Sequence, residues 1–301
     1  MQAIRLDTTQ FCGPEVLSGN IVSRYGSSYE SFKGTVSYRS FVRKLLCTAL
    51  QLTSKIDTVC SGFTGYHCAM TGLSASEKTP VPAILLDLDG TLMDSNYEHI
   101  AAWHEAFRSK GLEVPNARIH RCVGMSGRLM VRALFTELGR NIAPRKIEQL
   151  EQVHKRNFVK KLEYVHMLPG ARELLRDLSR RGVKWAIATG GDRQTVERMI
   201  KPLLIPAKAP VITADHVEKA KPDPDVFLMA ARRLGVELRD CIVVGDSVWD
   251  ILGARRAKAL GVGLLCGGYS AAELERAGAY RVYKDPADLH VHLSEIGIQP
   301  D

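Results

Sequence analysis

The fold of this chain is decided by the stretch Ala83-Ile84-Leu85-Leu86-Asp87-Leu88-Asp89-Gly90-Thr91-Leu92. An apolar run leads into two aspartates separated by one residue, a pattern that predicts a buried strand at 83–87 ending in paired carboxylates. Burial disfavours ionised carboxylates, and two close carboxylates repel each other. A bound divalent cation removes both costs, and open α/β sheets bind ligands at the carboxyl ends of their strands. We therefore expect a magnesium-dependent active site with an aspartate nucleophile.

The composition is that of a globular protein with a mild positive charge. The 301 residues are 45% hydrophobic and 25% charged, which suffices for one large or two modest domains. The net charge of +8 comes without a basic block or an Arg-rich motif. We expect attraction for anionic small molecules and no nucleic-acid partner.

Cysteine usage and hydropathy bear on the compartment. The seven cysteines are scattered without a CxxC pair, and their number is odd, so we expect no disulfide framework and a cytoplasmic location. No window approaches the ~18 apolar residues of a membrane span, and the first residues lack a secretory signal pattern. We expect no membrane partner.

Residues 1–80 differ from the rest of the chain. They are rich in serine and threonine and show little sustained periodicity, apart from a short amphipathic helix that could form from Ser40 to Leu52. We expect an N-terminal extension that is disordered or not part of the fold, and we assign it no chemistry. Two alternatives are an organellar targeting peptide and a translation start at Met70.

From residue 81 the pattern alternates between strands and helices. Alternation of this kind predicts an α/β fold, a Rossmann-like parallel sheet with helices on both faces. We expect this core domain to comprise residues 81–95 and 168–301. The expected strands are 83–87, 184–189, 210–213, 241–245, 261–265 and 280–283, and the expected helices 170–181, 192–203, 224–234, 248–257 and 271–277.

A helical insert follows the first strand. Residues 96–167 are expected to form a helical cap domain that covers the site, with helices at 96–110, 127–138 and 144–162. Leu168-Pro169-Gly170 marks the return to the core.

Polar motifs follow the ends of several expected strands. Each is weak alone, but their order on an α/β pattern is specific. The motifs are Asp87-Leu88-Asp89-Gly90-Thr91, Thr189-Gly190-Gly191, Lys221-Pro222-Asp223-Pro224 and Gly245-Asp246-Ser247-Val248-Trp249-Asp250.

This set resembles the haloacid dehalogenase superfamily of phosphotransferases, in its branch with a helical cap. The resemblance covers about residues 82–290 and extends to the cap stretches Asp94–His99 and Gly124–Arg128. Within this superfamily the chain resembles phosphoglycolate phosphatase-like and β-phosphoglucomutase-like proteins.

The resemblance implies roles for the acidic residues. Asp87 would attack phosphorus and form an aspartyl-phosphate, and Asp89 would act as general acid and then general base. Asp87 and Asp246 would bind Mg²⁺ through carboxylate oxygens and Asp89 through its backbone carbonyl. Asp250 would be a further ligand or an orienting residue.

The remaining core motifs would stabilise the transferring phosphoryl group. Thr189 and the Gly190 amide would donate hydrogen bonds to its oxygens, and Lys221 would neutralise charge and hold Asp87. Gly190 departs from the Ser or Asn often found at this position in the family.

Two cap residues are candidates for substrate binding. His99 follows the cap entry closely enough to reach the leaving group, and Arg128 could pair with a substrate carboxylate or second phosphate. The alternatives are a histidine bonded on a helix face and a solvated arginine at a helix start.

The leading interpretation is a Mg²⁺-dependent phosphatase of small organic phosphates, since a cap cannot easily admit a macromolecule. A β-phosphoglucomutase-like mutase is the first alternative, because it shares every core residue. A non-catalytic binding protein is the second, although Asp87, Asp89, Lys221 and Asp246 are all retained. The sequence leaves the substrate and the oligomeric state open.

Overall fold

The structure is a computed structural model that describes residues 21–25, 28–32 and 81–299. The chain divides into two units with a boundary between Ser76 and Glu77. In the first unit, β1 (Ile21–Tyr25) and β2 (Ser28–Phe32) pair as an antiparallel hairpin, which the sequence analysis did not predict. The helix expected from Ser40 to Leu52 lies outside the described residues.

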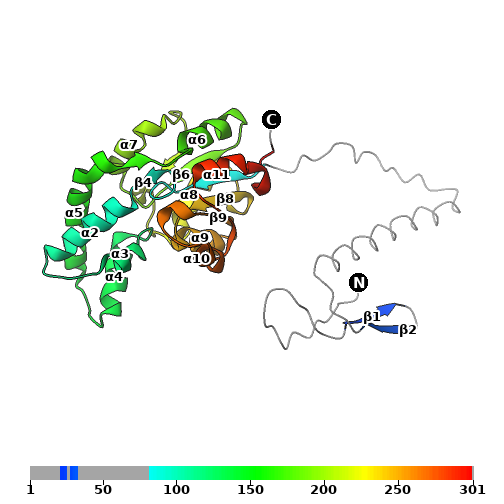
Figure 1. Ribbon diagram of the computed structural model, residues 1–301, viewed down its shortest axis with the longest axis horizontal. Helices are drawn as coiled ribbons and strands as arrows, with labels where there is room; N and C mark the ends of the chain where they lie inside the picture. The colour runs from blue at the N-terminus through cyan, green and yellow to red at the C-terminus, as the bar shows by residue number, and fades with distance from the viewer. Residues whose placement is uncertain (1–20, 26–27, 33–80, 300–301) are drawn as a thin grey trace. The chain divides into compact units, whose positions relative to one another are not determined.

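A six-stranded parallel sheet is the centre of the second unit (Figure 1). The strand order is β10-β9-β8-β3-β6-β7, so the strand carrying Asp87 lies in the middle of the sheet. The strands are β3 (Ala83–Leu86), β6 (Trp185–Ala188), β7 (Val211–Ile212), β8 (Cys241–Gly245), β9 (Leu260–Leu264) and β10 (Ala279–Tyr283).

Helices cover both faces of this sheet (Figure 1). The core helices are α6 (Ala171–Arg180), α7 (Arg193–Met199), α8 (Asp225–Leu234), α9 (Val248–Arg256), α10 (Ala271–Ala277) and α11 (Pro286–Val291). Because successive strand residues point to opposite faces, Ile84 and Leu86 pack with apolar residues of α6, α7 and α11, whereas Leu85 packs with those of α8 and α9. The predicted fold class is confirmed.

The cap leaves and rejoins the core through a short antiparallel pair. β4 (Met93–Asp94) pairs with β5 (His166–Met167). The cap helices between them have an apolar core of their own, centred on Trp103, Phe107, Leu134 and Leu150. These helices are α2 (Asn96–Arg108), α3 (Asn116–His120), α4 (Gly127–Glu137) and α5 (Pro144–Lys161).

The expected elements correspond closely to the observed ones. The short helices α3 and α11 and the pair β4–β5 were not predicted, because segments this short contain too few residues to establish a hydrophobic period. Within residues 81–299 the structure contains no helix with the length and hydropathy that a membrane span requires.

Candidate active site

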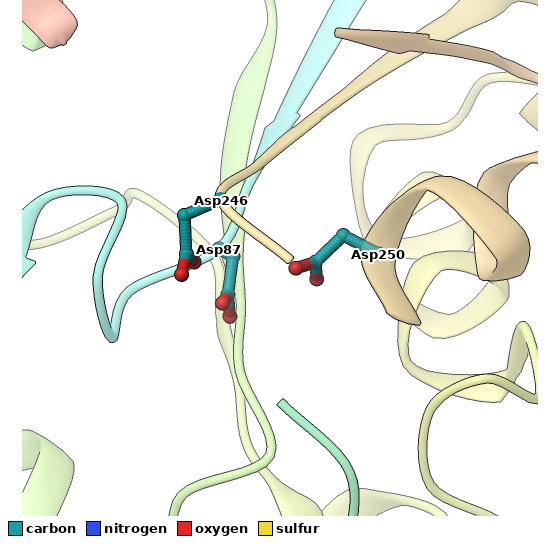
Figure 2. Close-up of side chains that lie close together, drawn as sticks. All are labelled: Asp87, Asp246 and Asp250. Atoms are coloured by element: carbon teal, nitrogen blue, oxygen red, sulfur yellow. The ribbon is translucent and has the colours of Figure 1, made fainter. Parts of the chain in front are cut away.

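Three buried aspartates meet at the carboxyl edge of the sheet (Figure 2). Asp87 directly follows β3, Asp246 directly follows β8, and Asp250 lies in the first turn of α9. One carboxylate oxygen from each lies within 4.8 Å of the others. The sequence-predicted ligands Asp87, Asp246 and Asp250 are thus brought together.

Local sequence fixes the position of Asp250. Ser247 is the N-cap of α9, and its hydroxyl accepts a hydrogen bond from the Asp250 backbone N–H. The Asp250 carboxylate in turn accepts hydrogen bonds from the Ser247 backbone N–H at 3.2 Å and from the Ser247 hydroxyl. This reciprocal capping arrangement holds the carboxylate against the turn after β8.

Lys221 joins two of the carboxylates. Its Nζ lies 2.5 Å from Asp87 Oδ1 and 2.8 Å from Asp250 Oδ1, and its side chain is 2% exposed. Burial opposes the charge, but the Asp250 and Asp87 carboxylates outweigh it and raise the pKa of Lys221. Lys221 is therefore a buried ammonium group.

Asp246 is held from both sides. Thr91 Oγ1 donates to its Oδ1 at 3.0 Å, and Asn96 Nδ2 donates to its Oδ2 at 2.8 Å. Gly90 has a positive φ of 72°, and a Cβ there would lie 2.4 Å from Asp246 Oδ2, so the turn can approach the carboxylate only as glycine. The sequence analysis missed Asn96, which carries no recognisable signal beyond its position after Ser95.

Burial and mutual repulsion raise the pKa of these carboxyls. Burial is the main cause of a pKa of about 7 for Asp246, with a further contribution from Asp250. For Asp87 burial again dominates, the Lys221 ammonium opposes it, and the neighbouring carboxylates add to it. Asn96 Oδ1 is also buried there, without a hydrogen-bond partner in the described part of the chain. An all-oxygen donor set with excess negative charge fits Mg²⁺.

Asp89 is not part of this cluster and has its own hydrogen-bond partners. Ser95 Oγ donates to Asp89 Oδ1 at 2.7 Å, Thr189 Oγ1 donates to its Oδ2 at 3.3 Å, and His99 Nε2 lies 3.2 Å from Oδ1. Burial acts to raise its pKa, but the charge and hydrogen bond of His99 and the hydrogen bond of Ser95 lower it to about 2. In this arrangement Asp89 is a carboxylate at neutral pH.

A cavity of about 230 Å³ lies between the core and the cap. Its walls on the core side include Thr189, Gly190 and Lys221. Asp87 and Asp89 also line the cavity, whereas Asp246 and Asp250 do not. A cavity of this size suits a small molecule.

His99 faces this cavity from helix α2. Its ring stacks on Phe158, with centroids 3.6 Å apart, and its Nδ1 lies 3.1 Å from His154 Nε2. Burial, together with the charge of His99, keeps the pKa of His154 well below its usual value. The structure therefore places His99 beside Asp89 in the cavity wall.

Arg128 does not line the cavity. Its side chain is 51% exposed, and its Nη2 lies 3.3 Å from Glu148 Oε1. The cavity-facing residue of this turn is Gly127, the first residue of α4. A one-residue step in a helix rotates a side chain by ~100°, so the predicted arginine points away from its glycine neighbour.

Several cavity residues were missed by the sequence analysis. Trp103, Glu151, His154 and Lys155 face the cavity from α2 and α5. Glu151, His154 and Lys155 share one side of α5 by their spacing, but the sequence does not distinguish a cavity face from a solvated face.

Contacts on two sides join the cap to the core. Lys155 Nζ lies 2.9 Å from Asp192 Oδ1, and His120 Nε2 lies 2.8 Å from the Gly267 carbonyl oxygen. The backbone carbonyl of Arg121, the residue after α3, accepts a hydrogen bond from Tyr269 Oη at 3.0 Å. The cap is therefore docked over the cavity.

The family model for haloacid dehalogenase-like hydrolases matches residues 81–258. A hydrolase from Pseudomonas syringae has a crystal structure that is 46% identical with a TM-score of 0.70, covering 71% of this chain and 99% of that one. Hexitol phosphatase A of Escherichia coli is 32% identical over 170 residues, which are 56% of this chain and 76% of that protein. Phosphoglycolate phosphatase of Xanthomonas campestris is 30% identical over 192 residues, which are 62% of this chain and 83% of that protein.

Proposed function

The chain belongs to the haloacid dehalogenase-like hydrolases, and from this membership we propose that it is a Mg²⁺-dependent phosphatase of small organic phosphate monoesters. Relatives named as a hexitol phosphatase and a phosphoglycolate phosphatase support an ester of this class. The observation that carries the proposal is the convergence of Asp87, Asp246 and Asp250 with Lys221 beneath a small cavity.

Asp87 is the proposed nucleophile. One of its oxygens forms a bond to phosphorus while the bond between phosphorus and the alcohol oxygen breaks. Water then forms a bond to the same phosphorus, the bond to Asp87 breaks, and inorganic phosphate leaves. The 2.5 Å contact with Lys221 holds the Asp87 carboxylate in place for both steps.

Mg²⁺ fits the acidic cluster. The carboxylates of Asp87 and Asp246 and the backbone carbonyl of Asp89 would hold it, and when bound it would neutralise charge on the nucleophile and the phosphoryl group. Asp250 is assigned to positioning Lys221, because its oxygens already contact Lys221 and Ser247. Thr91 and Asn96 orient Asp246.

Asp89 is the proposed general acid and base. It gives a proton to the leaving alcohol oxygen and later takes one from the attacking water. Its pKa of about 2 leaves the free carboxylate ionised, so protonation requires a change in its surroundings. An anionic phosphoryl group beside Asp89 raises that pKa by like-charge repulsion, which couples protonation to substrate binding.

The phosphoryl oxygens would be bound by donors on the core side of the cavity. Thr189 Oγ1, the Gly190 backbone N–H and the Lys221 ammonium are the proposed groups. His99 is proposed to face the leaving-group side, because it contacts Asp89 and lines the cavity.

The experiment that tests the proposal is release of inorganic phosphate from a panel of small phosphate esters. We expect turnover with Mg²⁺, loss of turnover with EDTA and recovery when Mg²⁺ is restored. Isothermal titration of Mg²⁺ into the protein supplies a readout that does not depend on activity. Turnover that persists in EDTA would contradict the role of the cation.

A mutase is the second candidate, supported by the contact between His99 and Asp89, which would serve transfer to a second hydroxyl equally well. A mutase requires a bisphosphate primer and releases little inorganic phosphate, so product analysis separates the two. The cytoplasmic location stays a prediction.

A further inference from the structure

The cap side of the cavity combines an aromatic wall with an acid and a base. Trp103 stacks on His154 with ring centroids 4.2 Å apart and an interplanar angle of 12°. Glu151 and Lys155 flank His154 on the same side of α5 and also line the cavity. A leaving group bound above the phosphoryl site would meet these residues.

The cations that line the cavity within residues 81–299 already have partners. Lys221 contacts Asp87 and Asp250, and Lys155 lies 2.9 Å from Asp192. A second anionic group on the substrate would therefore have to displace an existing carboxylate to gain a cation.

Gly127 prevents a further cation at the N-terminal turn of α4. A Cβ at this position would lie 2.8 Å from Trp103 Cζ2 and 3.1 Å from Glu151 Oε1, so no side chain fits while Trp103 holds its place. The neighbouring Arg128 is half-exposed and pairs with Glu148 instead. The position that faces the leaving group is thus closed to arginine and lysine.

Glu151 keeps hydrogen-bonding capacity toward the cavity. It accepts a hydrogen bond from the Arg128 backbone N–H, and a carboxylate has room for several donors. Its negative charge repels an anionic leaving group, and the Lys155 ammonium one turn away repels a cationic one. An uncharged group that carries hydroxyls avoids both repulsions. Each hydroxyl can donate a hydrogen bond to Glu151 and accept one from Lys155.

We propose that the substrate is the phosphate ester of an uncharged polyol or sugar, and that Glu151 determines this specificity by accepting a hydrogen bond from a leaving-group hydroxyl. Trp103 and His154, whose rings stack on each other and line the cavity, would contact the carbon chain of such a group. The inference rests on the proposed phosphatase function and narrows it. It disfavours phosphoglycolate, whose carboxylate would face Glu151, and equally the bisphosphate that a mutase needs.

The test compares esters that differ in leaving-group charge. Glucitol 6-phosphate, phosphoglycolate and phosphoethanolamine are assayed with Mg²⁺, with p-nitrophenyl phosphate as a substrate whose leaving group carries no hydroxyl. We expect kcat/KM for glucitol 6-phosphate to exceed those for phosphoglycolate and phosphoethanolamine by at least about tenfold. A preference for either charged ester would overturn the proposal.

Variants locate the preference in Glu151. In Glu151→Ala, the ratio of kcat/KM for glucitol 6-phosphate to that for p-nitrophenyl phosphate should fall about tenfold, the loss expected for one hydrogen bond to a charged group. Glu151→Gln keeps an acceptor but removes the charge, so discrimination against phosphoglycolate should weaken. The ratio of kcat/KM for glucitol 6-phosphate to that for p-nitrophenyl phosphate should fall less in this variant than in Glu151→Ala. Glu148→Ala, an exposed glutamate one turn earlier on α5, should leave all ratios unchanged.

The possible outcomes distinguish a failure of the proposed phosphatase function from a failure of the specificity role of Glu151. If no ester, including p-nitrophenyl phosphate, is hydrolysed, the proposed function fails and the inference fails with it. If esters are hydrolysed but Glu151→Ala lowers every kcat/KM by the same factor, the phosphatase assignment stands and the specificity role of Glu151 is refuted.

Discussion

Lys155 in the cap and Asp192 in the core form an ion pair, with Lys155 Nζ 2.9 Å from Asp192 Oδ1. Asp192 is also the N-cap of α7, where its side chain accepts a hydrogen bond from the Thr195 backbone N–H. The same carboxylate thus starts a core helix and contacts the cap. Both side chains are partly exposed, so the attraction between them is weakened by salt.

Removing the lysine should weaken cap closure. Lys155→Met keeps most of the side-chain volume, and we expect kcat/KM to fall about twofold to fivefold at low ionic strength, the range of a partly exposed ion pair. Because salt screens the pair, the difference from the unaltered protein should shrink as NaCl rises. The measurement is kcat/KM against ionic strength. Lys160→Met, which removes an exposed lysine from the same helix, is the control. An equal fall in kcat/KM in this variant would show that the loss of one positive charge, and not the loss of the ion pair with Asp192, causes the effect.

Replacing the proposed nucleophile should abolish turnover without unfolding the protein. Asp87→Asn is nearly isosteric, and Lys221 keeps its contact with Asp250, so the ammonium is not left unpaired. We expect phosphate release to fall by at least about 10³-fold, with unchanged far-UV circular dichroism. Asp223→Asn changes an exposed carboxylate two residues after Lys221 and should keep normal turnover. Substantial activity in Asp87→Asn would contradict the nucleophile assignment.

Asp177 should make stability depend on pH. Burial acts against its charge, but hydrogen bonds from Arg180, Arg181 and His290 outweigh burial and lower its pKa to about 2. Since the unfolded-state pKa is about 3.9, the stabilisation is complete above pH ~4 and is lost as pH falls toward 2.

The matching variant is Asp177→Asn. It should lower the free energy of unfolding at pH 7 by about 2 kcal/mol, with a deficit that narrows progressively below pH ~4. Urea denaturation at several pH values measures this difference directly, because groups common to both proteins cancel. Glu275→Gln on an exposed site serves as reference. A deficit that stays constant down to pH 3 would show that the carboxylate charge is not its source.

Two cavity glycines should respond oppositely to the same substitution. A Cβ on Gly190 meets nothing within 4 Å, whereas a Cβ on Gly127 would lie 2.8 Å from Trp103. Gly190→Ala should therefore raise the free energy of unfolding by about 0.4–1 kcal/mol, because alanine reduces the conformational entropy of the unfolded chain. Gly127→Ala should lower the free energy of unfolding by about 1–3 kcal/mol, because its methyl group overpacks the contact with Trp103. Thermal and urea denaturation of the two variants check this. Destabilisation by Gly190→Ala would refute the open space at that position.

The core of the fold could be predicted from the sequence, because its strands and helices have clear hydrophobic periodicity and its polar motifs follow strand ends. The run from Ala83 to Leu86 and the helix at Ala171–Arg180 each carry a clear pattern. Asp87, Asp89 and Asp246 were predictable for a related reason: parallel strands end at one edge, so residues just after strand ends converge. Lys221 lies further along the chain from the end of β7 at Ile212, and it was identified through the resemblance of its motif to the family.

The cap side of the site was harder to predict from the sequence. Tertiary packing decides which face of a helix lines the cavity, and the sequence of the helix does not show it. Arg128 was the natural candidate by chemistry, yet the turn that begins α4 directs Gly127 toward the cavity. Glu151 was indistinguishable from the other charged residues of α5, whose sequence is polar along most of its length. Asn96 acts through contacts with Asp246 and the Gly267 carbonyl, both far along the chain, and such long-range contacts cannot be predicted from the sequence.

The strand pair β4–β5 has a consequence for how such a molecule can be altered. The chain departs at Met93–Asp94 and returns at His166–Met167, side by side and in register, while the inserted helices have their own apolar centre. The chain enters and leaves the insert through one pair of strands, but the insert also contacts the core, at Asn96 with Asp246 and at Lys155 with Asp192. Exchanging it for an insert from another protein would therefore require matching the two strands and keeping these contacts, so that the acidic cluster stays in place while the surface above the cavity changes.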